Sequence, residues 1–164
     1  MKSLIEKIDS YQIITNLLPG AFLILLLKYL SIFDYNNLNK VEIIAICYFG
    51  GLIVGRIGSL VIEPILKKVC FIKYSEYNDF VKASKEDSKL DILVQTSNFN
   101  RSILTCVAIT PLIKVAQAIE ERWKVIQPGS KWVSIFLLIV LFLFAYRKQI
   151  KFIKDRVETV NSNQ

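Results

Sequence analysis

Two opposite charges stand seven positions apart in an apolar stretch of the sequence, GGLIVGRIGSLVIEPILKK at residues 50–68. They are Arg56 and Glu63. In a regular α-helix seven residues turn by about 700°, so both side chains would share one face, about 10 Å apart along the axis. A charge in apolar surroundings is unfavourable unless a partner satisfies it. The pattern predicts an intramembrane polar site, and no second carboxylate stands near Glu63 to make an acid–base pair.

Catalytic chemistry has few other candidates in this sequence. It contains no histidine, which removes a histidine base and a histidine metal ligand. Its three cysteines, Cys47, Cys70 and Cys106, match neither a metal-ligand spacing nor a CxxC pair. No nucleophile motif or glycine-rich phosphate loop occurs. We therefore expect a non-enzymatic protein without a metal or other cofactor.

The apolar content of the chain indicates a membrane protein. Of the 164 residues, 53% are hydrophobic, and the mean hydropathy is +0.42. Residues 132–146 are apolar on every side of a helix, and a chain of this length has no soluble core large enough to bury such a helix. A transmembrane helix needs about 20 mostly apolar residues. We predict an all-α fold with one membrane domain, 1–164, and transmembrane helices over 13–33, 43–66, 102–119 and 132–146.

The basic residues predict the orientation. Most Lys and Arg residues lie in the N-terminal segment, the loop 67–101 and the tail 147–164. The other two loops hold only Lys40, Arg122, Lys124 and Lys131. Because basic loops stay on the cytoplasmic side, both termini and the loop 67–101 are predicted to be cytoplasmic. The net charge of +7 then favours contact with anionic lipids, and no direct binding of nucleic acid is expected.

The cytoplasmic parts are predicted to be helical as well. The loop 67–101 has an amphipathic pattern typical of a short helical hairpin, and both ends of the chain have amphipathic helical patterns. The hairpin either covers the bundle as a solvated element or binds a cytoplasmic partner protein. The residues predicted to contact such a partner or lipid are Lys67, Lys68, Tyr77, Phe80, Lys82, Lys85, Arg147 and Lys148.

Small residues accompany the charge at position 56. Gly51, Gly55 and Ser59 are spaced four apart, and Gly58 widens the same face, which is typical of close helix packing in lipid. Arg56 stands eleven residues before Lys67, about 15 Å from the cytoplasmic boundary, so it is predicted to lie near the middle of the bilayer. The expected acceptors there are Thr110 and the Val107 carbonyl, which Pro111 deprives of its helical donor. The polar site serves either as structural support for the bundle or a homo-oligomer, or as the lining of a pore or switch.

Four segments, LLPG, RIGSLVIEPILKK, DFVKASKED and AYRKQ, resemble a family of small four-span bacterial membrane proteins that accompany anti-phage defence genes. In size and layout the chain is similar to the membrane subunit of the Kiwa defence system. The resemblance implies a homo-oligomeric protein of the bacterial inner membrane that senses infection or executes a membrane response with a cytoplasmic partner. A small homo-oligomeric ion channel and a passive membrane anchor for a soluble protein are the alternatives.

The predicted orientation has a direct test. A reporter enzyme that is active only in the periplasm, fused after Gln164, should give no signal, because the C-terminus is predicted to stay in the cytoplasm. Fusions in the loop 120–131 should be active and serve as the control. Strong activity of the Gln164 fusion would contradict the orientation.

Overall fold

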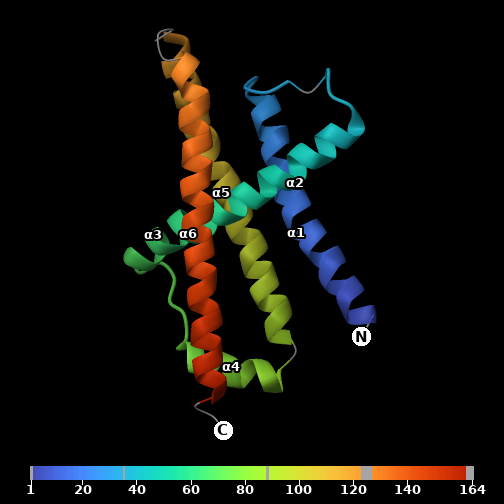
Figure 1. Ribbon diagram of the computed structural model, residues 1–164, viewed down its shortest axis with the longest axis vertical. Helices are drawn as coiled ribbons and strands as arrows, with labels where there is room; N and C mark the ends of the chain where they lie inside the picture. Colours follow the sequence, from blue (N-terminus) through green and yellow to red (C-terminus); the bar gives the residue numbers. More distant parts are fainter. Residues whose placement is uncertain (1, 35, 88, 123–126, 162–164) are drawn as a thin grey trace.

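The computed structural model describes residues 2–34, 36–87, 89–122 and 127–161, and in these residues the secondary structure is helical, with no strand. Side-chain surroundings are described for 15–34, 36–77, 79–84, 87, 89–122 and 132–159. The helices are α1 (Lys2–Tyr29), α2 (Lys40–Ile57), the π-helical turn η1 (Gly58–Ile62), α3 (Glu63–Lys68), α4 (Tyr77–Glu86), α5 (Lys89–Arg122) and α6 (Gln127–Asn161). The predicted all-α fold class is confirmed (Figure 1).

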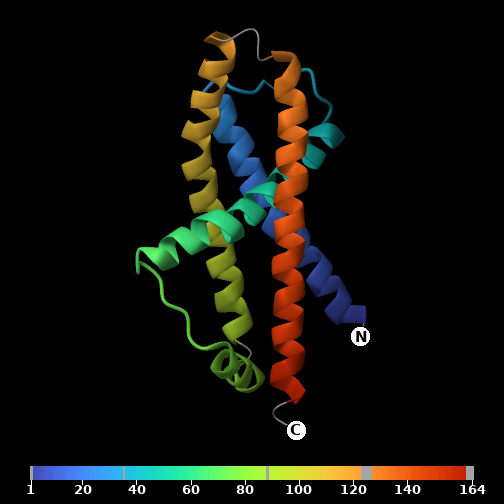
Figure 2. The same cartoon turned by 60° about the vertical axis from the view of Figure 1, so that its left-hand side comes forward.

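Helices α5 and α6 run antiparallel along the long axis of the molecule (Figures 1 and 2). Helix α2 crosses them obliquely, and α3 ends near the middle of their length. With 34 and 35 residues, α5 and α6 are each about 50 Å long, well beyond the roughly 30 Å of a hydrocarbon core. Past the level of α3 they continue beside α4. We call this part, made of α4 with residues 89–100 and 149–161, the helical extension.

Three helices are long and apolar enough to cross a membrane. They are the continuous segment Lys40–Lys68, which joins α2, η1 and α3, then Lys89–Arg122 and Trp132–Thr159. These correspond to three of the four predicted transmembrane helices. In α1 the described apolar part is shorter, Thr15–Tyr29, so the remaining predicted span, residues 13–33, stays a prediction. The second part of the loop 67–101 continues into the third apolar stretch, since α5 runs unbroken from Lys89.

Helices α1 and α2 form the most extensive helix–helix contact of the described chain. At their crossing two glycines let the backbones touch. A Cβ atom on Gly20 would clash with the Cys47 carbonyl oxygen, and one on Gly51 would clash with the Asn16 carbonyl oxygen. Glycine is therefore required at both positions, and this close contact holds the oblique α2 against α1.

The segment Lys40–Lys68 has clear structural signals at its start and near its end. Asn39 and Glu42 form a capping box, each side chain accepting a 2.9 Å bond from the other's backbone N–H. Further on, Pro64 has no N–H to donate, and the helix widens there into the π turn η1, in which the Glu63 N–H donates to the Gly58 carbonyl. The helix ends at Lys68, and Cys70, two residues later, has a left-handed φ of 57°, as is common after a helix C-terminus.

The glycine contact predicts a sharp difference between neighbouring positions. Gly51→Ala should lower the free energy of unfolding by about 1–3 kcal/mol or prevent assembly of the bundle, because its methyl group meets backbone that cannot move aside. Gly50→Ala is the matched control, since its Cβ would lie 3.9 Å from Leu23, an ordinary contact. Thermal unfolding in detergent measures both, and equal midpoints would contradict the packing of α1 on α2.

Candidate functional site

The polar centre of the structure is Glu63, a carboxylate that three cations share. Its exposed fraction is 7%. Arg101 Nη1 lies 2.7 Å from Glu63 Oε2, Lys148 Nζ lies 3.3 Å from the same oxygen, and Lys67 Nζ lies 3.0 Å from Oε1. The cations come from α5, α6 and α3, so one side chain joins three helices. We call these four residues the Glu63 cluster; its formal charge is positive, with three cations to one carboxylate.

Lys148 is held by more than the carboxylate. Its ammonium also donates to the Ser59 carbonyl oxygen at 2.6 Å and to Ser59 Oγ at 2.8 Å. The Ser59 carbonyl is free to accept because its two possible helical donors are lost. The Glu63 N–H bonds to Gly58, and Pro64 has no N–H. Ser59 and Glu63 thus provide three acceptors for the three N–H groups of Lys148, and they fix α6 against the π turn.

Arg101 lies in a space that a glycine leaves open. A Cβ on Gly58 would stand 2.7 Å from Thr105 Oγ1 and 3.4 Å from Arg101 Cγ, so even a methyl group at position 58 would displace Thr105 and contact the stem of Arg101. Thr105 is itself fully buried and donates to the Arg101 carbonyl at 2.7 Å. The guanidinium Nη1 reaches Glu63, while its Nε is buried without a hydrogen-bond partner in the described structure.

The Glu63 cluster lies where the apolar stretches end. Arg101 immediately precedes the apolar residues 102–119, and Lys148 follows the apolar residues 132–146 after Arg147. The contacts between Ser59, Glu63 and Lys148 place the end of the oblique segment Lys40–Lys68 at the same level. We call this level the basic end of the bundle. Beyond it continues the helical extension (Figure 2).

The predicted surroundings of Arg56 are wrong. Thr110 Oγ1 donates to the Cys106 carbonyl at 2.6 Å instead of accepting from Arg56, and in the described structure the Arg56 guanidinium has no hydrogen-bond or ion-pair partner. Arg56 also lies only three residues before Ser59, about 4.5 Å along the helix axis, so it is close to the basic end rather than midway along the apolar stretches. The difference arises because α2 crosses the bundle obliquely.

Glu63 and Arg56 do not act together either. The π turn between them adds one residue to the helical repeat, which rotates the chain after it by about 100° relative to the chain before it. Glu63 therefore faces α5 and α6 with its cations. Arg101 is the site residue that the sequence did not reveal by motif. Its position at the start of an apolar stretch, at the level where Lys148 ends another, was the available signal.

The predicted small-residue stripe packs helices of a single chain together. Gly51 contacts α1, and Gly58 receives Arg101 and Thr105 from α5. A Cβ on Gly55 would lie 4.0 Å from Ser102 of α5, and Ser59 binds Lys148 of α6. The described structure therefore uses this face within one chain, and self-association stays a prediction.

The residues predicted to contact lipid or a partner divide into two groups. Lys67 and Lys148 belong to the Glu63 cluster, and Lys67 also lies over the Tyr74 ring, 4.1 Å from its centre. The others lie apart from it. Tyr77 and Phe80 are half-buried on α4, and Lys68, Lys82 and Arg147 are exposed, while the side chain of Lys85 lies outside the described residues.

The described residues contain no group of three or more His, Cys, Asp or Glu side chains that could hold a metal ion. The interactions of the Glu63 cluster are ion pairs between helices at the ends of the apolar stretches. The chain is thus an all-helical protein with helices that can span a membrane. Comparison with protein-family models, with characterised proteins and with solved structures found no match for it.

The Glu63 cluster predicts a large effect from a small substitution. Glu63→Gln keeps the shape but leaves three cations without a counter-ion. We expect a loss of about 2–3 kcal/mol of stability, somewhat below the range for a fully buried pair, because Arg101 and Lys148 keep some solvent contact. Thermal unfolding in detergent measures the loss.

Glu158→Gln provides the control for this substitution. Glu158 pairs with Lys154 at 3.6 Å on an exposed surface, where an ion pair contributes about 0.5 kcal/mol or less. If both variants unfold at the same temperature, Glu63 does not hold the helices together.

Proposed function

We propose that the chain is a non-enzymatic membrane component of a bacterial defence system, which carries a signal between its helical extension and its membrane helices. It would reside in the inner membrane with four spans and both ends in the cytoplasm, assemble with copies of itself and bind a cytoplasmic partner. The defence setting comes from the resemblance of its sequence segments. The observation that supports the signalling role is the Glu63 cluster, which couples α3, α5 and α6 at the basic end.

The shape of the long helices favours such coupling. Residues 89–100 and 149–161 are continuous with the apolar parts of α5 and α6, so a force on the extension acts on rigid helices. Arg101 and Lys148 stand on these helices at the point of crossing and bind the same carboxylate oxygen. A displacement of either helix must therefore change the pairing of the other.

The helical extension offers a surface for the partner. On α4, Val81 is fully buried, whereas Lys82 is exposed and Tyr77 and Phe80 are only half-buried. Exposed or half-exposed aromatic rings are enriched at protein-binding surfaces. Residues 69–76 connect α3 directly to α4, so a partner bound to α4 would act on the chain a few residues after the Glu63 cluster.

The signalling role can be separated from passive anchoring by loosening α6. Lys148→Gln removes the bonds of α6 to Ser59 and Glu63 without changing an apolar side chain. We expect normal membrane insertion but loss of protection, measured as phage plating efficiency in cells that express the chain with its neighbouring genes. Lys151→Gln, at an exposed position one turn further on, should keep full protection.

A passive anchor predicts a different result. Protection would survive Lys148→Gln as long as the protein reaches the membrane at normal level, because an anchor needs no coupling between its helices. Membrane fractionation of both variants gives the protein level, and intact protection at an equal level would refute the signalling role.

A further inference from the structure

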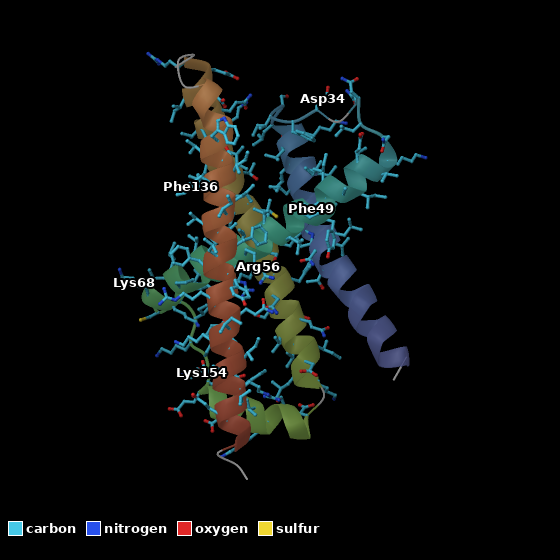
Figure 3. All side chains as sticks on the ribbon, in the orientation of Figure 1. Asp34, Phe49, Arg56, Lys68, Phe136 and Lys154 are labelled. Atoms are coloured by element: carbon cyan, nitrogen blue, oxygen red, sulfur yellow. The ribbon has the colours of Figure 1, made fainter. Side chains whose placement is uncertain are left out.

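An apolar groove runs between α2 and α6. It is open to the surroundings, has a volume of about 650 Å³ and is lined by Phe49 and Ile53 of α2 and, among others, by Ile139, Phe142 and Tyr146 of α6. Lys148 makes the hydrogen bonds that join α6 to the π turn, whereas Phe49 and the α6 side chains that line the groove are exposed. Figure 3 labels Phe49 and Arg56 on the part of α2 that passes α6.

Arg56 follows Ile53, a lining residue of this groove, by about one turn of α2. Positions 49, 53 and 56 share one face of α2 by helical spacing, and that face lines the groove. The Arg56 side chain is half-buried and has no hydrogen-bond, ion-pair or ring partner in the described structure. A guanidinium carries five donors, and so many unmet donors beside an apolar surface indicate an acceptor that is supplied from outside the chain.

The level of Arg56 matches the headgroups of a bilayer. Ser59, three residues after Arg56, bonds to Lys148 at 2.6 Å, and Gly55 faces Ser102, the first residue of the apolar stretch 102–119, so this part of α2 lies near the ends of both apolar stretches. Arg56 precedes Ser59 by about 4.5 Å along an oblique helix. Its long side chain can therefore reach the boundary while its stem stays in apolar surroundings. Tyr146, whose exposed ring lines the groove, is a residue typical of this boundary.

The charge at this level is positive and leaves no internal anion for Arg56. Glu63 already faces Lys67, Arg101 and Lys148. In the described segments Lys40–Lys68, 102–119 and 132–146, the acids are Glu42, at the opposite end, and Glu63. A second copy of these segments would therefore bring no free carboxylate to Arg56.

We propose that an anionic phospholipid binds here, with one acyl chain along the groove and its phosphate on the Arg56 guanidinium. The groove provides the apolar surface for the chain, and the planar fork of Arg56 matches two phosphate oxygens. The positive Glu63 cluster favours a headgroup with net negative charge over a zwitterionic one. The site depends on the membrane location in the proposed function but not on signalling.

Native mass spectrometry of the purified full-length protein with added phosphatidylglycerol or phosphatidylcholine tests this site. The wild type should retain phosphatidylglycerol in preference to phosphatidylcholine. Arg56→Gln should weaken retention of phosphatidylglycerol about tenfold, because one doubly hydrogen-bonded charge pair is lost. It should still fold, since removing an unpaired charge takes away a burial cost, and its unfolding temperature verifies this.

Two further variants separate the groove from general charge. Lys68→Gln removes the same charge at an exposed position and should retain the lipid as the wild type does. Ile53→Trp fills the groove and keeps Arg56, and it should also weaken retention. Equal retention of the two lipids by the wild type, or unchanged retention by Arg56→Gln, would overturn the lipid site.

A second copy of the chain in the groove would give another result. Arg56→Gln would then lower the oligomeric state while the number of bound lipids stayed the same, which would also overturn the lipid site. The outcome for the proposed function is separate. Protection that survives Lys148→Gln refutes signalling while lipid retention stays intact, and lost lipid selectivity with an intact Lys148 effect refutes only the lipid site.

Discussion

The structure depends on a shared counter-ion at the point where three helices leave their apolar surroundings. Glu63 pairs with one cation from each of α3, α5 and α6. Without this carboxylate, the three cations would repel one another and separate the helices that carry them. The neighbouring residues are each required by this arrangement. Gly58 makes room for Thr105 one turn after Arg101, Ser59 provides two acceptors to Lys148, and Pro64 frees one of them. A segment of seven residues, 58–64, thus sets how α3, α5 and α6 lie relative to one another.

The excess of positive charge limits where such a cluster can lie. Three cations around one carboxylate would be strongly unfavourable in the middle of a hydrocarbon layer, where even one unpaired Arg costs at least about 2.5 kcal/mol. At the ends of the apolar stretches, water and headgroups can compensate the excess. The partial exposure of Lys67, Arg101 and Lys148, at 47%, 22% and 25% of their side chains, agrees with that location.

Much of the architecture followed from the sequence because hydropathy and charge act locally. Three of the apolar stretches could be predicted, since length and composition alone decide them. The level of Arg56 could not, because the tilt of α2 is set by its glycine contact with α1, which joins distant parts of the chain. The pairing of Glu63 was missed for a similar reason. Helical spacing assumes a regular helix, whereas the π turn before Pro64 rotates Glu63 away from the face of Arg56.

The two opposite charges in GGLIVGRIGSLVIEPILKK, Arg56 and Glu63, therefore face different surroundings. Before the π turn, Arg56 keeps the face of α2 that Phe49 and Ile53 present to the groove. After it, Glu63 turns toward α5 and α6. A regular helix would have put both on one face, where Arg56 would compete with Arg101 and Lys148 for the same carboxylate. The proline that interrupts the hydrogen bonding thus keeps the two charges apart, and it leaves Glu63 to the bundle and Arg56 to whatever lies outside it.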